Sequence, residues 1–256
     1  KLAKTFCYAN RCYGAESYIK GFSGYALELL VCYFGGFVKF LKGINKKRVI
    51  DSEKFYKNES EIRREMNESK LQSPVILIDP VYKYRNACAG LSDETFSKFL
   101  KQAKSFVKNP SDKFFEKQEL DVDKIKKLGK KKGVFVELNL ETNKQEGDIA
   151  GTKMKKFFDF FVRELERKQQ KILSKEFKYD DGKTAKGYLI IDENKEIEIR
   201  GPVVDNKDAV RKFKLARKKV YSKKGFVFAK EKVSLDEIFA FLKNFEDDMS
   251  VRFEVV

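Results

Sequence analysis

The sequence predicts an α+β protein in two parts, the first mostly helical and the second mixed, with a strongly basic segment toward the end. Three observations support this prediction. Apolar residues repeat at helical spacing up to about residue 116, strand-like runs alternate with helices from about residue 120, and Lys and Arg gather between residues 207 and 232. We therefore expect two domains, over residues 1–117 and 118–256.

In the first part, residues 21–40 form an apolar run interrupted by glycines and charges. The run predicts a buried helix, a turn and a second helix, and it is a poor membrane span. Residues 54–73 are charged and predict a solvated excursion or a short surface helix, and residues 75–78 predict a buried strand. Ser92 is placed to cap a helix that Asn109-Pro110 ends.

The second part begins with a predicted strand at residues 134–138 and an amphipathic helix at residues 154–165. Two strands, at 188–191 and 197–199, follow around a polar turn. This β-α-β-β order resembles part of a ferredoxin-like sandwich. After it we expect a basic helix at residues 206–219 and a strand at 226–229. A helix that begins with a capping box of Ser234 and Glu237 should follow, and then a final strand at 251–255.

The composition is that of a globular chain with a large excess of positive charge. Of 256 residues, 42% are hydrophobic and 37% are charged, and 55 Lys and Arg against 39 Asp and Glu give a formal net charge of +16. This surplus is more than solubility requires and indicates a polyanionic partner. The chain opens within a helical pattern, without Met and without a secretion signal, so we expect a fragment or a trimmed chain from the cytoplasm.

Histidine is absent, and the four cysteines include no CxxC pair. This composition excludes the usual zinc sites, a Ser/His/Asp triad and a Cys/His dyad. We expect reduced, mostly buried thiols. Any acid or base chemistry would depend on Asp, Glu, Lys or Tyr.

The basic segment between Lys207 and Lys232 contains eleven Lys and Arg but only two acidic residues. Like charges repel along one helix unless a partner neutralises them, and the phosphates of RNA are the simplest such partner. A solvated, lysine-rich face is the alternative. The candidate RNA-binding residues are Arg200, Lys207, Arg211, Lys212, Lys214, Arg217, Lys218 and Lys219.

Several short blocks in the first 116 residues have a recognisable order and spacing. They are Tyr-Gly-Ala-Glu at 13–16, Lys-Gly-Phe-Ser-Gly-Tyr at 20–25, Glu-Leu-Leu at 28–30, Asp-Pro-Val at 79–81, Arg-Asn at 85–86, Leu-Ser at 91–92, Pro-Ser at 110–111 and Phe-Phe at 114–115. In these blocks the sequence resembles the archaeal, class I, CCA-adding tRNA nucleotidyltransferases. Beyond residue 120 the similarity rests on Arg-Gly-Pro at 200–202 and the basic helix.

The resemblance implies a central all-α, substrate-binding domain of the kind shared with poly(A) polymerases and oligoadenylate synthetases, over residues 1–117. A ferredoxin-like domain and a tail that grips the tRNA acceptor arm would follow, over residues 118–256. Family members add C, C and A to the tRNA 3′ end from CTP and ATP. The expected partners are tRNA, these nucleotides and, because the family is often dimeric, a second copy of the chain, with no membrane.

The resemblance also implies three nucleotide-binding residues. Lys4 and Tyr13 match positions that touch the triphosphate, and Arg85 matches an arginine that helps to select C or A, although Tyr84 replaces the lysine of the family motif. A lysine neutralises phosphate charge, a tyrosine hydroxyl donates to phosphate oxygens, and a guanidinium donates two parallel hydrogen bonds. The alternatives are a solvated helix charge, a turn aromatic and a salt-bridge partner, respectively.

The chemistry of this superfamily needs carboxylates that hold two Mg²⁺ ions, on a Gly-Ser turn followed by Asp-x-Asp. No Gly-Ser pair occurs here, and the Asp-Val-Asp of residues 121–123 precedes a basic helical run, so we interpret it as a helix N-terminus. We expect no catalytic or metal-binding residue in this chain, and Mg²⁺ bound by a head domain in cis or on a separate chain. Two rivals remain: a stand-alone RNA-binding protein, and the tail of a poly(A)-type polymerase.

Overall fold

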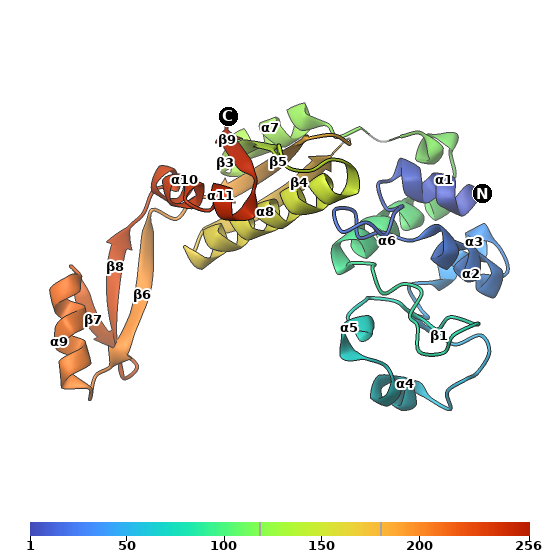
Figure 1. The fold of residues 1–256 in the computed structure, drawn as a ribbon, viewed down its shortest axis with the longest axis horizontal. Helices are drawn as coiled ribbons and strands as arrows, with labels where there is room; N and C mark the ends of the chain where they lie inside the picture. Colours follow the sequence, from blue (N-terminus) through green and yellow to red (C-terminus); the bar gives the residue numbers. More distant parts are fainter. Residues whose placement is uncertain (118, 180) are drawn as a thin grey trace. The chain divides into compact units, whose positions relative to one another are not determined.

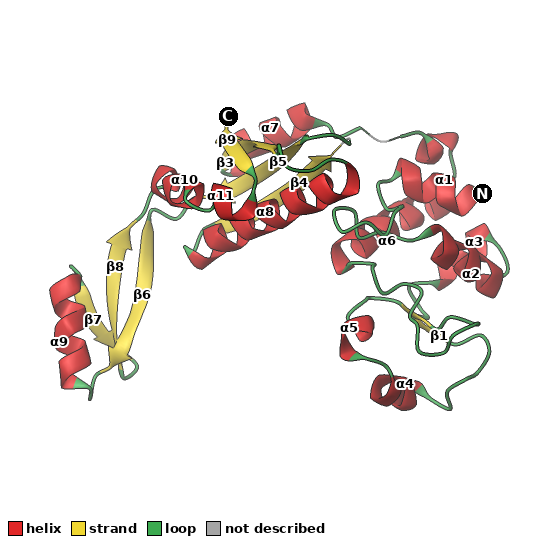
Figure 2. Ribbon diagram, in the orientation of Figure 1, coloured by secondary structure: helices red, strands yellow, loops and turns green. Residues whose placement is uncertain are grey.

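A computed structural model describes residues 1–117, 119–179 and 181–256. The chain divides into two compact units, Lys1–Leu120 and Asp121–Val256 (Figure 1). The first unit is mainly helical and the second combines helices with two sheets (Figure 2). The predicted α+β class is therefore confirmed.

Four α-helices and a short 3-10 helix surround the core of the first unit. They are α1 (Leu2–Ala9), α2 (Gly24–Phe34), α3 (Phe37–Gly43), α6 (Asp93–Lys108) and η1 (Asp112–Phe115). The core is rich in phenylalanine: Phe22 and Phe99 are fully buried with ring centroids 4.9 Å apart, and Phe40 stacks on Phe99 at 5.4 Å. Such aromatic contacts add to the free energy gained from burial alone.

The helix-turn-helix expected at residues 21–40 is present as α2 and α3. Ser23 caps α2 by accepting a hydrogen bond from the amide of Ala26, and Gly35 ends it in the left-handed conformation. Within the described residues no single helix is long and apolar enough to cross a membrane. Only α2 and α3 taken together pass that test, with a 90° bend between them.

The charged segment at residues 54–73 is more than a surface helix. It forms α4 (Glu59–Glu65) and α5 (Glu68–Leu71), and the buried Ile62 and Met66 pack with Tyr56 in a small second core. The predicted strand is β2 (Ile76–Leu77), which pairs in parallel with an unpredicted strand, β1 (Val49–Ile50). The few apolar residues of this segment therefore form a core, which its charged composition did not predict.

In the second unit, one sheet has the strand order of a ferredoxin-like fold. Its order is β4-β5-β3-β9, all neighbours are antiparallel, and α8 (Gly147–Arg167) packs on it. The strands are β3 (Val134–Glu141), β4 (Lys171–Tyr179), β5 (Thr184–Asp192) and β9 (Arg252–Val255). In chain order these are the first, second, third and fourth strands of a β-α-β-β-α-β unit.

A second sheet is inserted between β5 and the helix that leads to β9. It has the order β6-β8-β7, with α9 packed on β6. Its elements are β6 (Glu196–Val203), α9 (Lys207–Ala216), β7 (Val220–Lys223) and β8 (Phe226–Lys232). The two strands predicted around a polar turn are therefore not partners, because β5 pairs with β3 and β4 whereas β6 pairs with β8. The predicted basic helix also ends three residues early, at Ala216.

Helix caps in the second unit match the sequence signals. Ser234 and Glu237 form the predicted capping box of α10 (Leu235–Lys243), which is followed by α11 (Glu246–Met249). Asp121 caps α7 (Val122–Lys132) by accepting a hydrogen bond from the amide of Lys124. The Asp-Val-Asp sequence is thus a helix N-terminus, as predicted.

Candidate nucleotide and RNA-binding sites

The first turn of α2 brings two of the three predicted nucleotide-binding residues together. A methyl group added to Gly24 would lie 3.0 Å from the hydroxyl of Tyr13 and 3.3 Å from Nζ of Lys4. The two side chains therefore converge on a helix N-terminus, where free amides and the helix dipole already favour an anion. A cation, a hydroxyl donor and a helix N-terminus together suit a phosphate group.

Lys4, on α1, is held in place by an acidic side chain from α2. Its Nζ lies 2.6 Å from Oε1 of Glu28, and both side chains are partly exposed. The hydrogen bond with Glu28 raises the pKa of Lys4, and the same bond lowers the pKa of Glu28. Lys4 is thus part of an ion pair and is more than a solvated helix charge. Glu28 was missed in the sequence analysis, because a contact across 24 residues leaves no local signal in the sequence.

The loop that carries Tyr13 is closed by backbone hydrogen bonds. The amide of Phe22 donates to the carbonyl of Cys12, and the amide of Gly14 donates to the carbonyl of Phe22. A Cβ at Gly21 would lie 2.4 Å from the carbonyl oxygen of Cys12, so this position requires glycine. Gly21 and Phe22 of the sequence block thus shape and close the loop that holds Tyr13 in place.

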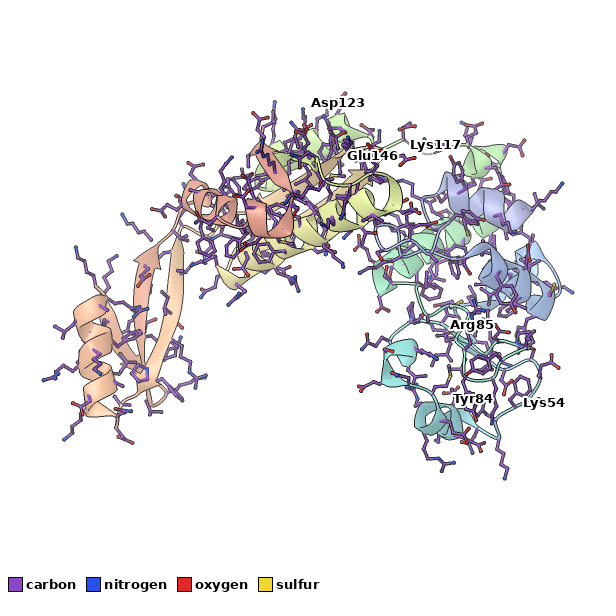
Figure 3. The ribbon with its side chains drawn as sticks, in the orientation of Figure 1. Lys54, Tyr84, Arg85, Lys117, Asp123 and Glu146 are labelled. Atoms are coloured by element: carbon purple, nitrogen blue, oxygen red, sulfur yellow. The ribbon has the colours of Figure 1, made fainter. Side chains whose placement is uncertain are left out.

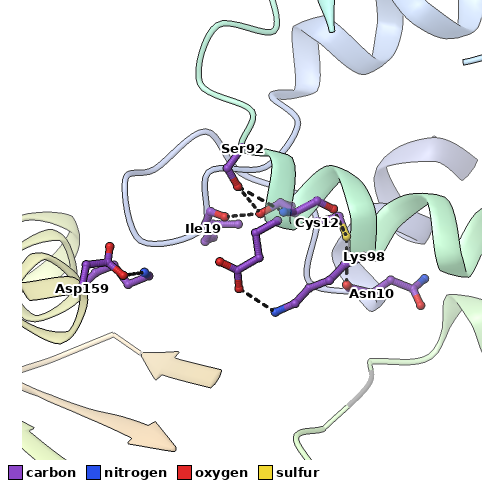
Figure 4. A network of polar contacts seen from close by, with 9 residues as sticks. Asn10, Cys12, Ile19, Ser92, Lys98 and Asp159 are labelled. Atoms are coloured by element: carbon purple, nitrogen blue, oxygen red, sulfur yellow. Dashed lines mark hydrogen bonds and ion pairs between the residues drawn. The ribbon is translucent and has the colours of Figure 1, made fainter. Parts of the chain in front are cut away.

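A polar network ties the other end of this loop to α6 (Figure 4). The hydroxyl of Thr95 donates to the carbonyl of Ile19, and the hydroxyl of Ser92 donates to that of Thr95, at 2.9 and 3.0 Å. Burial raises the pKa of the nearby Cys12 thiol to about 12, so this thiol stays protonated and unreactive and contributes to packing. Cys7 and Cys88 are also buried and Cys32 is exposed, which matches the expectation that most of the thiols are buried.

Arg85, labelled in Figure 3, lies beside Tyr25 in the first turn of α2. Its guanidinium is 5.5 Å from the centre of the Tyr25 ring and 3.4 Å from Oδ2 of Asp79. Tyr25 donates a 3.0 Å hydrogen bond to the other oxygen of Asp79. The Asp79 side chain is 3% exposed and that of Arg85 is 60% exposed. Asp79 therefore anchors an arginine whose outer donors stay open to a ligand.

The residue after Arg85 supports the loop from within. Asn86 is buried, and its side-chain oxygen accepts hydrogen bonds from the amides of Leu77 and Cys88. Its side-chain nitrogen donates to the carbonyls of Lys70 and Val75. The Arg-Asn pair of the sequence thus combines an exposed side chain with one that holds the backbone.

The described parts of the chain offer no site for a metal ion. No group of three or more His, Cys, Asp or Glu side chains is placed to bind one. Near the predicted nucleotide-binding residues, Glu28 is paired with Lys4, and Asp79 accepts from Tyr25 and from the amide of Val81. This set of donors does not fit two Mg²⁺ ions, each of which prefers near-octahedral oxygen coordination. Asp123 belongs to the start of α7, in the second unit (Figure 3).

The predicted RNA-binding residues fall into two groups in the structure. Some have partners: Arg217 pairs with Glu231, Lys219 pairs with Glu196, and Arg200 lies over the ring of Phe226. The remaining ones are exposed, and the described residues give them no ion pair. They are Lys207, Arg211, Lys212 and Lys214 on α9, with Lys218 just after it.

The sheet beside α9 holds a tyrosine with a strongly perturbed pKa. Tyr221 donates a hydrogen bond to Glu198, which raises the pKa of Tyr221 to about 12, with burial as a smaller cause, and lowers the pKa of Glu198. Because a tyrosine normally titrates near pH ~10, we expect this phenol to stay protonated at pH 11. Tyrosine ring carbon NMR shifts followed against pH measure it.

The same titration has a matched variant. Glu198→Gln removes the negative charge and should return the Tyr221 pKa toward its ordinary value. Because the folded-state pKa is raised, the stabilisation from this pair is present at neutral pH and is lost as the pH rises through about 12. Ordinary titration of Tyr221 in the unsubstituted protein would contradict this account of the contact.

Comparison with known proteins finds a family model and relatives that are similar to this chain. Residues 1–116 match the family model described as tRNA nucleotidyltransferase, second domain. The CCA-adding enzyme of Pyrococcus abyssi is 32% identical over 188 residues, which cover 70% of this chain and 41% of that enzyme. The resemblance to archaeal CCA-adding enzymes is confirmed.

Two further CCA-adding enzymes show the same range of similarity. That of Nanoarchaeum equitans is 44% identical over 112 residues, 43% of this chain and 29% of the enzyme. That of Thermococcus gammatolerans is 29% identical over 208 residues, 77% of this chain and 44% of the enzyme. The chain thus spans less than half the length of these CCA-adding enzymes, and the similarity extends beyond the helical unit in two of them.

Proposed function

We propose that this chain is the nucleotide-binding and tRNA-positioning part of a CCA-adding tRNA nucleotidyltransferase, which adds C, C and A to the tRNA 3′ end from CTP and ATP. The observation that carries the proposal is the convergence of Lys4 and Tyr13 on the first turn of α2, with Arg85 beyond Tyr25. Residues far apart in the sequence thus meet around one helix start.

In this proposal the site has a phosphate side and a base side. The Lys4 ammonium neutralises triphosphate charge, the Tyr13 hydroxyl donates to a phosphate oxygen, and the first amides of α2 face the same anion. Arg85 presents its exposed guanidinium to acceptors on the edge of cytosine or adenine. Glu28 and Asp79 keep the two cations in position.

The carboxylates that bind Mg²⁺ belong, in this proposal, to a head domain outside these 256 residues, in cis or on a separate chain. Two facts support this: the chain covers only 41% of the Pyrococcus relative, and its described residues hold no fitting set of ligands. No step that involves the metal is assigned to residues of this chain. The exposed cations of α9 grip the phosphates of the tRNA acceptor arm in the cytoplasm, and a homodimer is a further expected assembly.

Reconstitution tests the proposal. The chain, a catalytic head from an archaeal CCA-adding enzyme, and a tRNA that lacks its 3′ end are mixed with labelled CTP and ATP. We expect CMP and AMP to be incorporated only when the chain and the head are both present, with addition ending after one A. Incorporation that the chain does not stimulate would contradict the proposal.

The same assay separates the rivals. Repeated addition of A without C would favour the tail of a poly(A)-type polymerase. Binding of tRNA without any stimulated incorporation, and without a change on adding CTP or ATP, would favour a stand-alone RNA-binding protein. As a control, a head domain whose catalytic Asp residues are replaced by Asn shows whether incorporation depends on catalysis by the head and not merely on the presence of a second protein.

A further inference from the structure

The turn before Arg85 exposes an unusual run of large side chains. Val81 is 86% exposed, Tyr82 is 56% exposed and Tyr84 is 40% exposed. The two tyrosine rings lie 5.7 Å apart between centroids, edge to face. Neither ring is part of the two cores of the helical unit. Aromatic side chains that leave this much surface in water at one place indicate a binding surface.

This turn is exposed but firmly held. The amide of Arg85 donates to the carbonyl of Tyr82, and the amide of Asp79 donates to the carbonyl of Arg85. Side chains from outside the turn hold two more carbonyls: Tyr56 donates to that of Lys83 at 2.8 Å, and Lys70 donates to that of Tyr84 at 2.9 Å. The rings are therefore presented on a fixed backbone, which lowers the entropy cost of binding.

The chemistry around the rings favours a nucleobase over a protein side chain. Nζ of Lys83 lies 4.8 Å from the centre of the Tyr84 ring, and Arg85 follows in the same turn with its guanidinium mostly exposed. Exposed aromatic rings beside cations are the combination that binds single-stranded nucleic acid, because the rings stack with bases while the cations attract the phosphates. Figure 3 shows Tyr84 and Arg85 on the same part of the helical unit.

We propose that Tyr82 and Tyr84 form a stacking platform for an unpaired base of the RNA strand whose 3′ end reaches Arg85. The platform rests on the proposed function, and it adds a contact for the RNA strand to the contacts already proposed for the nucleotide. Stacking is tolerant of base identity, so the platform would position the strand while Arg85 reads a base.

The test combines protein variants with RNA that lacks single bases. The full chain binds a 5′-labelled tRNA, either intact or with one abasic nucleotide at each position near its 3′ end. We expect the double variant Tyr82→Ala, Tyr84→Ala to weaken binding of intact RNA about tenfold, and Tyr→Phe at both positions to keep it. One abasic position should weaken binding to the unsubstituted chain and should leave binding to the alanine double variant unchanged.

Controls keep the outcomes distinct. Phe241→Ala removes an aromatic ring that is 42% exposed in the second unit, and it should not change the effect of any abasic position. If the chain binds tRNA but the Tyr→Ala double variant binds it equally well, or if both proteins respond alike to every abasic position, the platform is wrong and the proposed function stands. A protein-binding role for these rings would give this result. Failure of the unsubstituted chain to bind tRNA would overturn both.

Discussion

Replacing Asn86 with alanine is expected to lower the free energy of unfolding of the helical unit by about 3 kcal/mol, because it leaves buried backbone groups without partners. The side chain accepts from two amides and donates to two carbonyls across three separate segments. Asn86→Asp keeps the acceptor but places a charge against the carbonyls of Lys70 and Val75, so it should also destabilise. Urea unfolding followed by NMR signals of the helical unit measures both.

A matched control uses an asparagine outside the core. Asn45 is exposed and its side chain accepts one hydrogen bond, from Arg48. Asn45→Ala should therefore change the free energy of unfolding by less than about 0.5 kcal/mol. An Asn86→Ala variant as stable as Asn45→Ala would show that this side chain does not hold the loop that carries Arg85.

Removing the exposed cations of α9 is expected to flatten the salt dependence of tRNA binding. With Lys207, Arg211, Lys212 and Lys214 all replaced by alanine, the slope of log affinity against log salt should fall in magnitude by about 3, since each phosphate contact contributes roughly 0.7 to 0.9. Affinity at low salt should fall with it. If this lysine-rich face is only solvated and does not bind RNA, the slope should not change.

Helix α7 supplies a control of equal charge. Lys127, Lys130, Lys131 and Lys132 are exposed on this helix, and the described residues give them no ion pair. Replacing these four lysines with alanine removes the same net charge from another surface. If both quadruple variants change the slope equally, the effect belongs to the net charge of the chain, and α9 is not the specific surface for RNA.

The sequence predicted the features that depend on neighbouring residues. Ser92 begins α6, and Ser234 with Glu237 begins α10, because a cap needs only a side chain and an amide two or three residues later. The class of the second unit was also predictable, because its first strand and helix have strong periods. Lys4 and Tyr13 were named through a family resemblance, and the structure brings them side by side.

Features that depend on distant residues were not predicted. β4 was missed because the consecutive polar residues 174–176 interrupt its apolar pattern, and only its pairing with β5 defines this edge strand. β6 was predicted as a separate strand, but its pairing with β8 joins residues about 30 positions apart and was not predicted. The contacts of Glu28 with Lys4 and of Asp79 with Tyr25 join residues that are 24 and 54 positions apart in the chain, and a single sequence contains no signal for them.

The central claim is that one site has a phosphate side at Lys4 and a base side at Arg85. It is tested most directly by the kcat/KM values for CTP and ATP in the reconstituted enzyme. Lys4→Ala should lower both values by the same factor, at least about tenfold, because the triphosphate is common to both nucleotides. Arg85→Ala should change the ratio of the two values. Equal effects of Arg85→Ala on CTP and ATP, or no effect of Lys4→Ala, would contradict the claim.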